Sequence, residues 1–97
     1  MQYAIRIYQV KEGAVDDWLR EWSDAVVPLR ERFGFRVTNA WVSDDGRTFV
    51  WVLEYDGEDF AAANAAYYDS PDRSALEPDP ARHLESVREI VAHRVDL

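Results

Sequence analysis

The sequence contains no cysteine, and Lys11 is its only lysine. The absence of cysteine excludes disulfides, thiolate nucleophiles and cysteine-ligated metal sites, and it is typical of proteins in a reducing compartment. We therefore expect a cytoplasmic protein. A single lysine also disfavours catalysis through a Schiff base, which needs a lysine amine as the nucleophile.

Basic residues are fewer than acidic ones, 11 against 19, and the net charge is −8. Nucleic acids and anionic membranes are bound mainly through clusters of Lys and Arg, and this sequence has no such cluster. We expect neither nucleic acid nor membrane as a partner. Residues 1–10 lack the features of a signal peptide, and no apolar run approaches the roughly 20 residues of a membrane span.

Aromatic residues, in contrast, are abundant: they make up 13% of the 97 residues, with four Trp and five Tyr. A chain of this length predicts one domain, and we assign residues 1–97 to it. Because such a small domain buries only about 60–65% of its unfolded surface, some aromatic side chains are expected in a subunit interface or a ligand cleft.

Four segments have the composition of β-strands. They are rich in β-branched and aromatic residues and comprise residues 3–10, 35–43, 48–55 and 86–97. An Asp-Gly pair within 44–47 predicts a hairpin between the second and third segments. The third is apolar on both faces up to Glu54, which predicts a strand that is buried on both sides.

Two further segments have the periodicity of α-helices. Between Ala14 and Gly34 apolar residues recur at helical spacing, and Pro28 is expected to kink this helix near residues 24–25 because it lacks a backbone N–H. Residues 57–68 predict a second, alanine-rich helix. The order β-α-β-β-α-β predicts the α+β class and the ferredoxin-like fold, a four-stranded antiparallel sheet with both helices on one face.

The uncovered face of this sheet is predicted to be apolar. We expect Tyr8, one residue of the pair Trp41 and Val42, and one of the pair Trp51 and Val52 to point toward it. An apolar sheet face that no helix covers calls for a partner. We therefore predict a homodimer in which two sheets pack face to face as a barrel.

Three stretches carry a resemblance to a known family: 3-YAIRIYQVKEG-13, 26-VVPLRERFGF-35 and 51-WVLEYDGEDF-60. The chain resembles the NIPSNAP family, within the dimeric α/β-barrel superfamily, over nearly its whole length. More distant relatives include cofactor-independent monooxygenases, lactone isomerases, polyketide cyclases and haem-binding barrels. The resemblance implies a cleft between sheet and helices that accepts small, often aromatic, molecules. Nothing in the sequence marks a haem site, and we expect no cofactor.

Candidate catalytic residues come from the first strand and from the two histidines. Arg6 and Tyr8 share one side of the strand, where Arg6 could orient an anionic or carbonyl group and Tyr8 could donate a proton. Alternatively, Arg6 forms a structural ion pair, with Glu54 as a candidate partner. His83 and His93 could act as general bases or be surface or packed residues. A metal site would need a third ligand that the spacing does not show, so we expect no metal.

Candidate substrate-binding residues are aromatic or carry an amide. Asn39 and Trp41 share a face of the second strand, where Asn39 could polarise a carbonyl and Trp41 could stack on a flat ligand. Trp51 on the third strand is a further candidate. The alternative for the pair on the second strand is structural, with Asn39 at an edge position and Trp41 in the core.

The connector 67-YYDSPDRSALEPDP-80 is longer than most loops and holds three of the four prolines. It begins with Tyr67 and Tyr68 at the end of the second helix, and Pro71 should terminate that helix. One interpretation is a semi-rigid flap at the mouth of the cleft, with Tyr67 or Tyr68 contacting the ligand. The other is a connector whose tyrosines only cover the edge of the core.

Two functions are compatible with these predictions. The first is a cofactor-free enzyme or binder of a small aromatic or polyketide-like molecule, acting by proton transfer with isomerisation, cyclisation or oxygenation as the outcome. The second is a non-catalytic homodimeric protein-interaction module. A concave pocket with convergent polar groups would favour the first, and an apolar patch left uncovered by dimerisation would favour the second.

Overall fold

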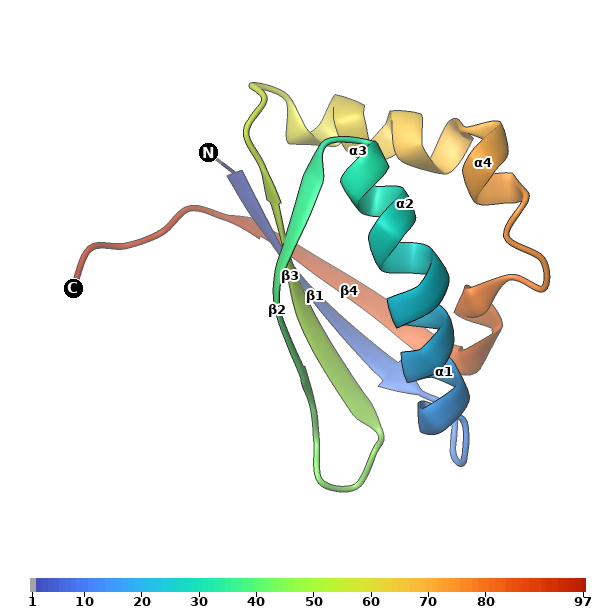
Figure 1. Ribbon diagram of the computed structural model, residues 1–97. Coiled ribbons are helices and arrows are strands. Elements are labelled where there is room, and N and C mark those ends of the chain that lie inside the picture. Colours follow the sequence, from blue (N-terminus) through green and yellow to red (C-terminus); the bar gives the residue numbers. More distant parts are fainter. Residues whose placement is uncertain (1) are drawn as a thin grey trace.

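The computed structural model describes residues 2–97 and forms a two-layer structure, with a sheet on one side and helical segments on the other (Figure 1). The four strands have the order β2-β3-β1-β4, and every neighbouring pair is antiparallel. This arrangement confirms the predicted ferredoxin-like α+β fold. In chain order the elements are β1 (Gln2–Val10), α1 (Val15–Glu21), η1 (Trp22–Val26), α2 (Val27–Arg32), β2 (Phe35–Val42), β3 (Thr48–Tyr55), α3 (Phe60–Asp69), α4 (Pro71–Ser74), η2 (Pro80–His83) and β4 (Leu84–Ala92).

The first helical segment runs from α1 through η1 into α2, and η1 is a π-helical turn. The N–H of Val27 donates to the carbonyl of Trp22, five residues earlier. Pro28 follows and has no N–H to donate, so regular α-helical hydrogen bonding is interrupted at this point. The irregularity predicted near residues 24–25 therefore takes the form of a widened helical turn.

The element boundaries differ most from the predicted ones at the start of α3 and at the end of β4. α3 begins at Phe60, because the side chain of Asp59 accepts a hydrogen bond from the N–H of Ala62 and caps the helix. β4 ends at Ala92, so His93 lies beyond the strand that was predicted over 86–97. The predicted hairpin between β2 and β3 is present, and Gly46 in its turn has a φ of +72°, which favours glycine.

None of the helices found in residues 2–97 has both the length and the apolar character that crossing a lipid bilayer requires.

The strand register separates the two faces of the sheet. On β1, Tyr8 is only 4% exposed and lies in the core under the helices, next to its strand partner Phe49. Trp51 on β3 is 1% exposed and lies in the same core. The prediction that Tyr8 points to the uncovered face is therefore wrong. That face receives Trp41 and Val52, since side chains alternate along a strand and Trp51 points to the helices.

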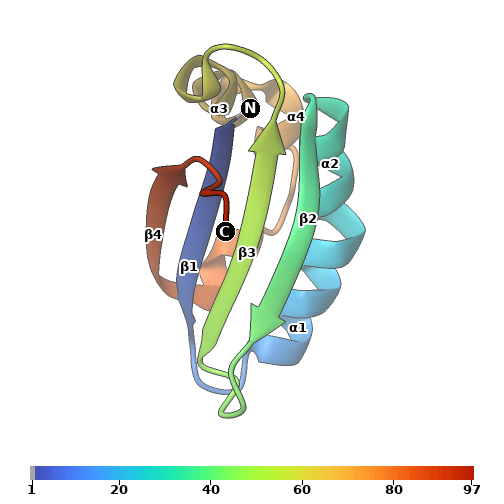
Figure 2. The same cartoon turned by 90° about the vertical axis from the view of Figure 1, so that its left-hand side faces the viewer.

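One face of the sheet carries no helices and is turned toward the viewer in Figure 2. Trp41, in strand β2, is 56% exposed. We call this surface the open face. Its apolar side chains come from all four strands and include Ile5, Ile7, Trp41, Val50, Val52 and Ile90.

Candidate functional site

A cavity of about 220 Å³ lies between the helix-facing side of the sheet and the helical layer. We call it the central cavity. Five of the nine residues predicted for the site line it. The side chains that matter for its chemistry are Arg6, Tyr8 and Trp51 from the sheet and Arg30, Tyr67 and Tyr68 from the helices.

Arg6 is the centre of a hydrogen-bonded cluster on the sheet side of the cavity. Its Nε donates to the hydroxyl of Tyr8 at 2.6 Å, and its Nη2 donates to the hydroxyl of Tyr68 at 2.8 Å. Its Nη1 forms an ion pair with Glu89, the residue opposite it on β4. Burial acts to lower the pKa of Arg6, but Tyr8, Tyr68 and Glu89 outweigh it and the pKa is raised. Arg6 is therefore a fixed, charged group.

The alternative interpretation of Arg6 was an ion pair with a carboxylate, for which Glu54 was one candidate. The structure contains such a pair, but its carboxylate is that of Glu89 and not that of Glu54. Glu54 pairs across the strands with Arg36, at 3.7 Å between Arg36 Nη2 and Glu54 Oε1. On β3, the side chains of Trp51 and Leu53 are buried under the helices. Because side chains alternate along a strand, Glu54 points to the opposite face.

Arg30, on α2, enters the cavity from the helical side and is 1% exposed. Its Nη1 donates to Oδ1 of Asn64 at 2.9 Å, and its guanidinium carbon lies 3.7 Å from the centre of the Tyr67 ring. Within residues 2–97 no carboxylate forms an ion pair with it. Burial lowers the pKa of Arg30, but an arginine stays charged at neutral pH. The cavity wall thus contains a buried cation beside neutral groups.

Two tyrosine hydroxyls of the cavity wall are kept in the protonated form. Burial raises the pKa of Tyr8 and also that of Tyr67. The hydroxyl of Tyr67 is buried and has no hydrogen-bond partner in the described part of the chain. Protonated phenols donate hydrogen bonds, so these groups can stabilise a carbonyl oxygen or an oxyanion in the cavity.

Histidine and carboxylate side chains are absent from the cavity lining, as far as residues 2–97 are concerned. The lining can therefore donate hydrogen bonds and neutralise negative charge, but it holds no group with an ordinary general-base pKa. Nor do three His, Asp or Glu residues gather into a possible metal site anywhere in this range.

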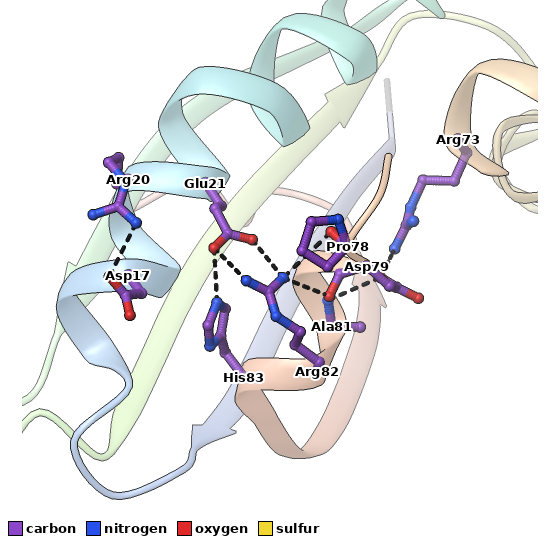
Figure 3. Close-up of polar contacts among 9 residues, drawn as sticks. All are labelled: Asp17, Arg20, Glu21, Arg73, Pro78, Asp79, Ala81, Arg82 and His83. Carbon is purple, nitrogen blue, oxygen red and sulfur yellow. Dashed lines mark hydrogen bonds and ion pairs between the residues drawn. The ribbon is translucent and has the colours of Figure 1, made fainter. Parts of the chain in front are cut away.

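His83 lies outside the central cavity, so the prediction that it lines the cleft is wrong. It belongs to η2, and its Nε2 lies 2.9 Å from Oε2 of Glu21 on α1 (Figure 3). Arg82 binds both carboxylate oxygens of Glu21, each at 2.8 Å. Hydrogen bonds from Arg82 and His83 lower the pKa of Glu21 to about 2. His83 thus helps to hold η2 against α1.

The connector 67–80 runs beside the cavity, as its flap interpretation requires. It is partly helical, since Ser70 caps α4 by accepting from the N–H of Arg73. Arg73 and Pro80 join Tyr67 and Tyr68 in the lining, and Arg73 is tied to Asp79 at 3.0 Å. The connector is therefore a wall of the cavity, and any movement of this wall stays a prediction.

The three remaining predicted residues lie on the other side of the sheet. Asn39 and His93 line a second hollow, of about 210 Å³, on the open face. Trp41 is exposed on the same face. The prediction of a single cleft containing all nine residues is therefore wrong, because the sheet separates Asn39, Trp41 and His93 from the central cavity.

Sequence reasoning missed Arg30, although the sequence contains a signal for it. Trp18, Trp22, Val26 and Arg30 follow one another at intervals of four, so Arg30 continues a buried row of the helix. A charged residue in such a row is either paired or functional.

Comparisons with known proteins agree with this architecture. A NIPSNAP domain protein from Burkholderia xenovorans has a TM-score of 0.82 and 21% identity, covering 98% of this chain and 95% of that one. A NIPSNAP family protein from Agrobacterium tumefaciens C58 has a TM-score of 0.83 and 16% identity, covering 98% and 93%. An antibiotic biosynthesis monooxygenase has a TM-score of 0.71 and 18% identity, covering 99% and 100%. At these identities the likeness is one of fold.

No curated protein matches this sequence. The family model NIPSNAP, however, matches residues 3–94, which is nearly the whole chain. The protein therefore belongs to the NIPSNAP family.

Proposed function

We propose that the protein binds a small aromatic or polyketide-like molecule in the central cavity and promotes cofactor-independent proton-transfer chemistry on it, of the isomerase, cyclase or monooxygenase type. The observation that carries this proposal is the buried hydroxyl of Tyr67, which has no hydrogen-bond partner in residues 2–97. Tyr67 is one of the residues that line a cavity of about 220 Å³. A buried polar group of this kind calls for a partner such as a ligand.

The size and walls of the cavity define the ligand. A cavity of roughly 150 Å³ accepts a benzene molecule, so about 220 Å³ accommodates one substituted ring or a short cyclising chain. Trp18, Trp51 and Tyr8 offer aromatic surface to it. Such walls stack on flat molecules and exclude water, which strengthens polar contacts inside the cavity.

The polar groups of the cavity lining favour substrates that carry an acidic proton. Arg6 fixes the position of the Tyr8 hydroxyl at 2.6 Å, and Tyr8 can donate to a carbonyl oxygen that becomes an enolate. Because the lining within residues 2–97 has no histidine or carboxylate, the substrate has to lose its own proton readily. Phenols and 1,3-dicarbonyl compounds have this property.

The quaternary structure forms part of the proposal. The open face carries Trp41 at 56% exposure, together with Ile5 and Val52. Pairing of two chains through this face would cover these side chains. The same face favours the second candidate function, a non-catalytic homodimeric protein-interaction module, if the central cavity binds nothing.

Native mass spectrometry of the freshly purified protein, followed by titration with phenol and acetylacetone, tests the proposal. We expect one small molecule for each chain and a change in tryptophan fluorescence, because Trp18 and Trp51 line the cavity. Tyr8→Phe should weaken binding about three- to tenfold through loss of one hydrogen bond. Tyr55→Phe is the matched control, since Tyr55 is a β3 residue outside the cavity lining. Absence of both a bound molecule and any response would refute the proposal in favour of the interaction module.

A further inference from the structure

Positive charge exceeds negative charge around the central cavity. Arg6 and Arg30 are 5% and 1% exposed, whereas the protein as a whole carries a net charge of −8. Arg6 is neutralised by Glu89, and Arg73 at the cavity wall is neutralised by Asp79. Arg30 alone among these three has no carboxylate partner within residues 2–97.

Neutral groups compensate only part of the cost of burying Arg30. Its Nη1 has the amide oxygen of Asn64 as acceptor, and its guanidinium lies 3.7 Å from the ring centre of Tyr67 and 4.9 Å from that of Phe35. These contacts stabilise a cation but do not cancel its charge. Its Nε is buried and has no hydrogen-bond acceptor in the part of the chain that the structure describes.

Four residues that line the central cavity each have a buried donor without an acceptor in residues 2–97: Trp18 and Trp51 at Nε1, Arg30 at Nε, and Tyr67 at its hydroxyl. Two of them, Arg30 and Tyr67, lie together, with 3.7 Å between the guanidinium carbon and the ring centre. A neutral carbonyl oxygen could accept a hydrogen bond but would leave the charge of Arg30 uncompensated. An anionic oxygen supplies both the acceptor and the missing charge.

We propose that Arg30 is the anion-binding residue of the central cavity, and that the ligand is a one-ring monoanion whose negative oxygen lies beside Arg30 and Tyr67. The inference rests on the proposed function, from which it takes the cavity and the aromatic ligand. One unpaired guanidinium matches one negative charge, and an acidic protein disfavours polyanions such as nucleotides. The anion can be a carboxylate or an enolate, since both present an acceptor oxygen with one negative charge.

Matched pairs of acid and neutral analogue test the inference on the unmodified protein. The probes are 4-hydroxybenzoate against 4-hydroxybenzamide for the carboxylate, and the enolate of 1,3-cyclohexanedione against its neutral ethyl enol ether. Calorimetric titration should show at least about tenfold tighter binding of one anion than of its neutral counterpart, which corresponds to a charge-assisted hydrogen bond. The pair that shows the difference identifies the source of the negative charge.

Variants of Arg30 test whether this residue causes the difference in affinity between the anion and its neutral analogue. Arg30→Gln should abolish the preference for the anion, and Arg30→Lys, which keeps the charge, should retain part of it. Arg32→Gln is the matched control, because Arg32 lies on the same helix but is exposed and pairs with Asp72. It should leave the preference unchanged.

The possible results separate the inference from the proposed function. Equal binding of acid and neutral analogue by the unmodified protein would overturn the inference and leave the aromatic-binding function standing. Absence of binding by every probe, together with no co-purified molecule, would overturn both. If Arg30→Gln does not fold, the comparison on the unmodified protein and on Arg30→Lys still decides the question.

Discussion

The guanidinium of Arg30 lies 3.7 Å from the centre of the Tyr67 ring, and both side chains are almost completely buried. This contact joins α2 to α3 at the wall of the central cavity. Five of the ten residues of α3 are alanine, whose small side chain offers little area for packing. The same pair of residues therefore contributes to the folded state and defines the polar side of the cavity.

Replacement of Tyr67 by Phe should separate these two roles. The ring and its contact with Arg30 are kept, while a buried hydroxyl without a hydrogen-bond partner in residues 2–97 is removed. We expect the free energy of unfolding to stay constant or rise by up to about 1 kcal/mol, and ligand affinity to fall. Urea unfolding and calorimetric titration measure the two effects. A loss of stability above about 1 kcal/mol would show that the hydroxyl has a structural role.

Replacement of Glu89 by Gln should lower stability and raise ligand affinity. It leaves the buried Arg6 without its carboxylate, so we expect the free energy of unfolding to fall by roughly 1–3 kcal/mol. Because the cavity then carries a further unpaired positive charge, affinity for a monoanion should increase. Glu85→Gln is the matched control: Glu85 is exposed on the same strand and pairs with Arg47. Unchanged stability would contradict the importance of the Arg6–Glu89 pair.

The Glu21 cluster predicts a particular dependence of stability on pH. The pKa of Glu21 is lowered to about 2 from 4.5 by Arg82 and His83, so its stabilising effect is complete above pH 4.5 and is lost as the pH falls toward 2. Solvent screening limits this effect to roughly 1–2 kcal/mol, since Glu21 lies near the surface.

Chemical denaturation at a series of pH values between 5 and 2 measures this effect. Glu21→Gln should lower stability at pH 5 and show a smaller decrease on acidification than the unmodified protein. Glu31→Gln, which changes an exposed acidic residue of α2, should behave like the unmodified protein. Equal acid dependence in Glu21→Gln and the unmodified protein would count against the cluster.

The open face predicts the oligomeric state. Light scattering coupled to size exclusion should give twice the chain mass for the unmodified protein, because pairing would cover Trp41 and Ile90. The double variant Trp41→Asp, Ile90→Asp should give a monomer, since unpaired carboxylates in an interface are strongly disfavoured. Ala61→Asp, on the exposed surface of α3, serves as the control. A monomeric unmodified protein would refute this prediction.

Strand composition, helical periodicity and the Asp-Gly turn were together sufficient to predict the fold, because the order of strands and helices matches the ferredoxin-like arrangement. They could not assign the faces of β1. Ile5 and Ile7 are apolar on one side, and Ala4 and Tyr8 are compatible with burial on the other. The choice depends on strand pairing across the sheet, which is a non-local property.

The candidate site was predicted only in part for the same reason. Arg6 and Tyr8 were placed together correctly because they are two residues apart on one strand. Asn39 and His93 were assigned to the wrong side because nothing local relates β2 or the residues after β4 to the helical layer. Arg30 could have been found from its place in the buried row of the first helix, by asking why a charge continues an apolar row.

The reversal of charge between the acidic exterior and Arg30 has a kinetic consequence. An anion that approaches a protein with a net charge of −8 is repelled before it reaches the cavity. Added salt screens this long-range repulsion but hardly weakens a contact with a buried guanidinium. Moderate ionic strength should therefore accelerate association of an anionic ligand while leaving its residence time nearly unchanged, which is the reverse of an electrostatically steered enzyme.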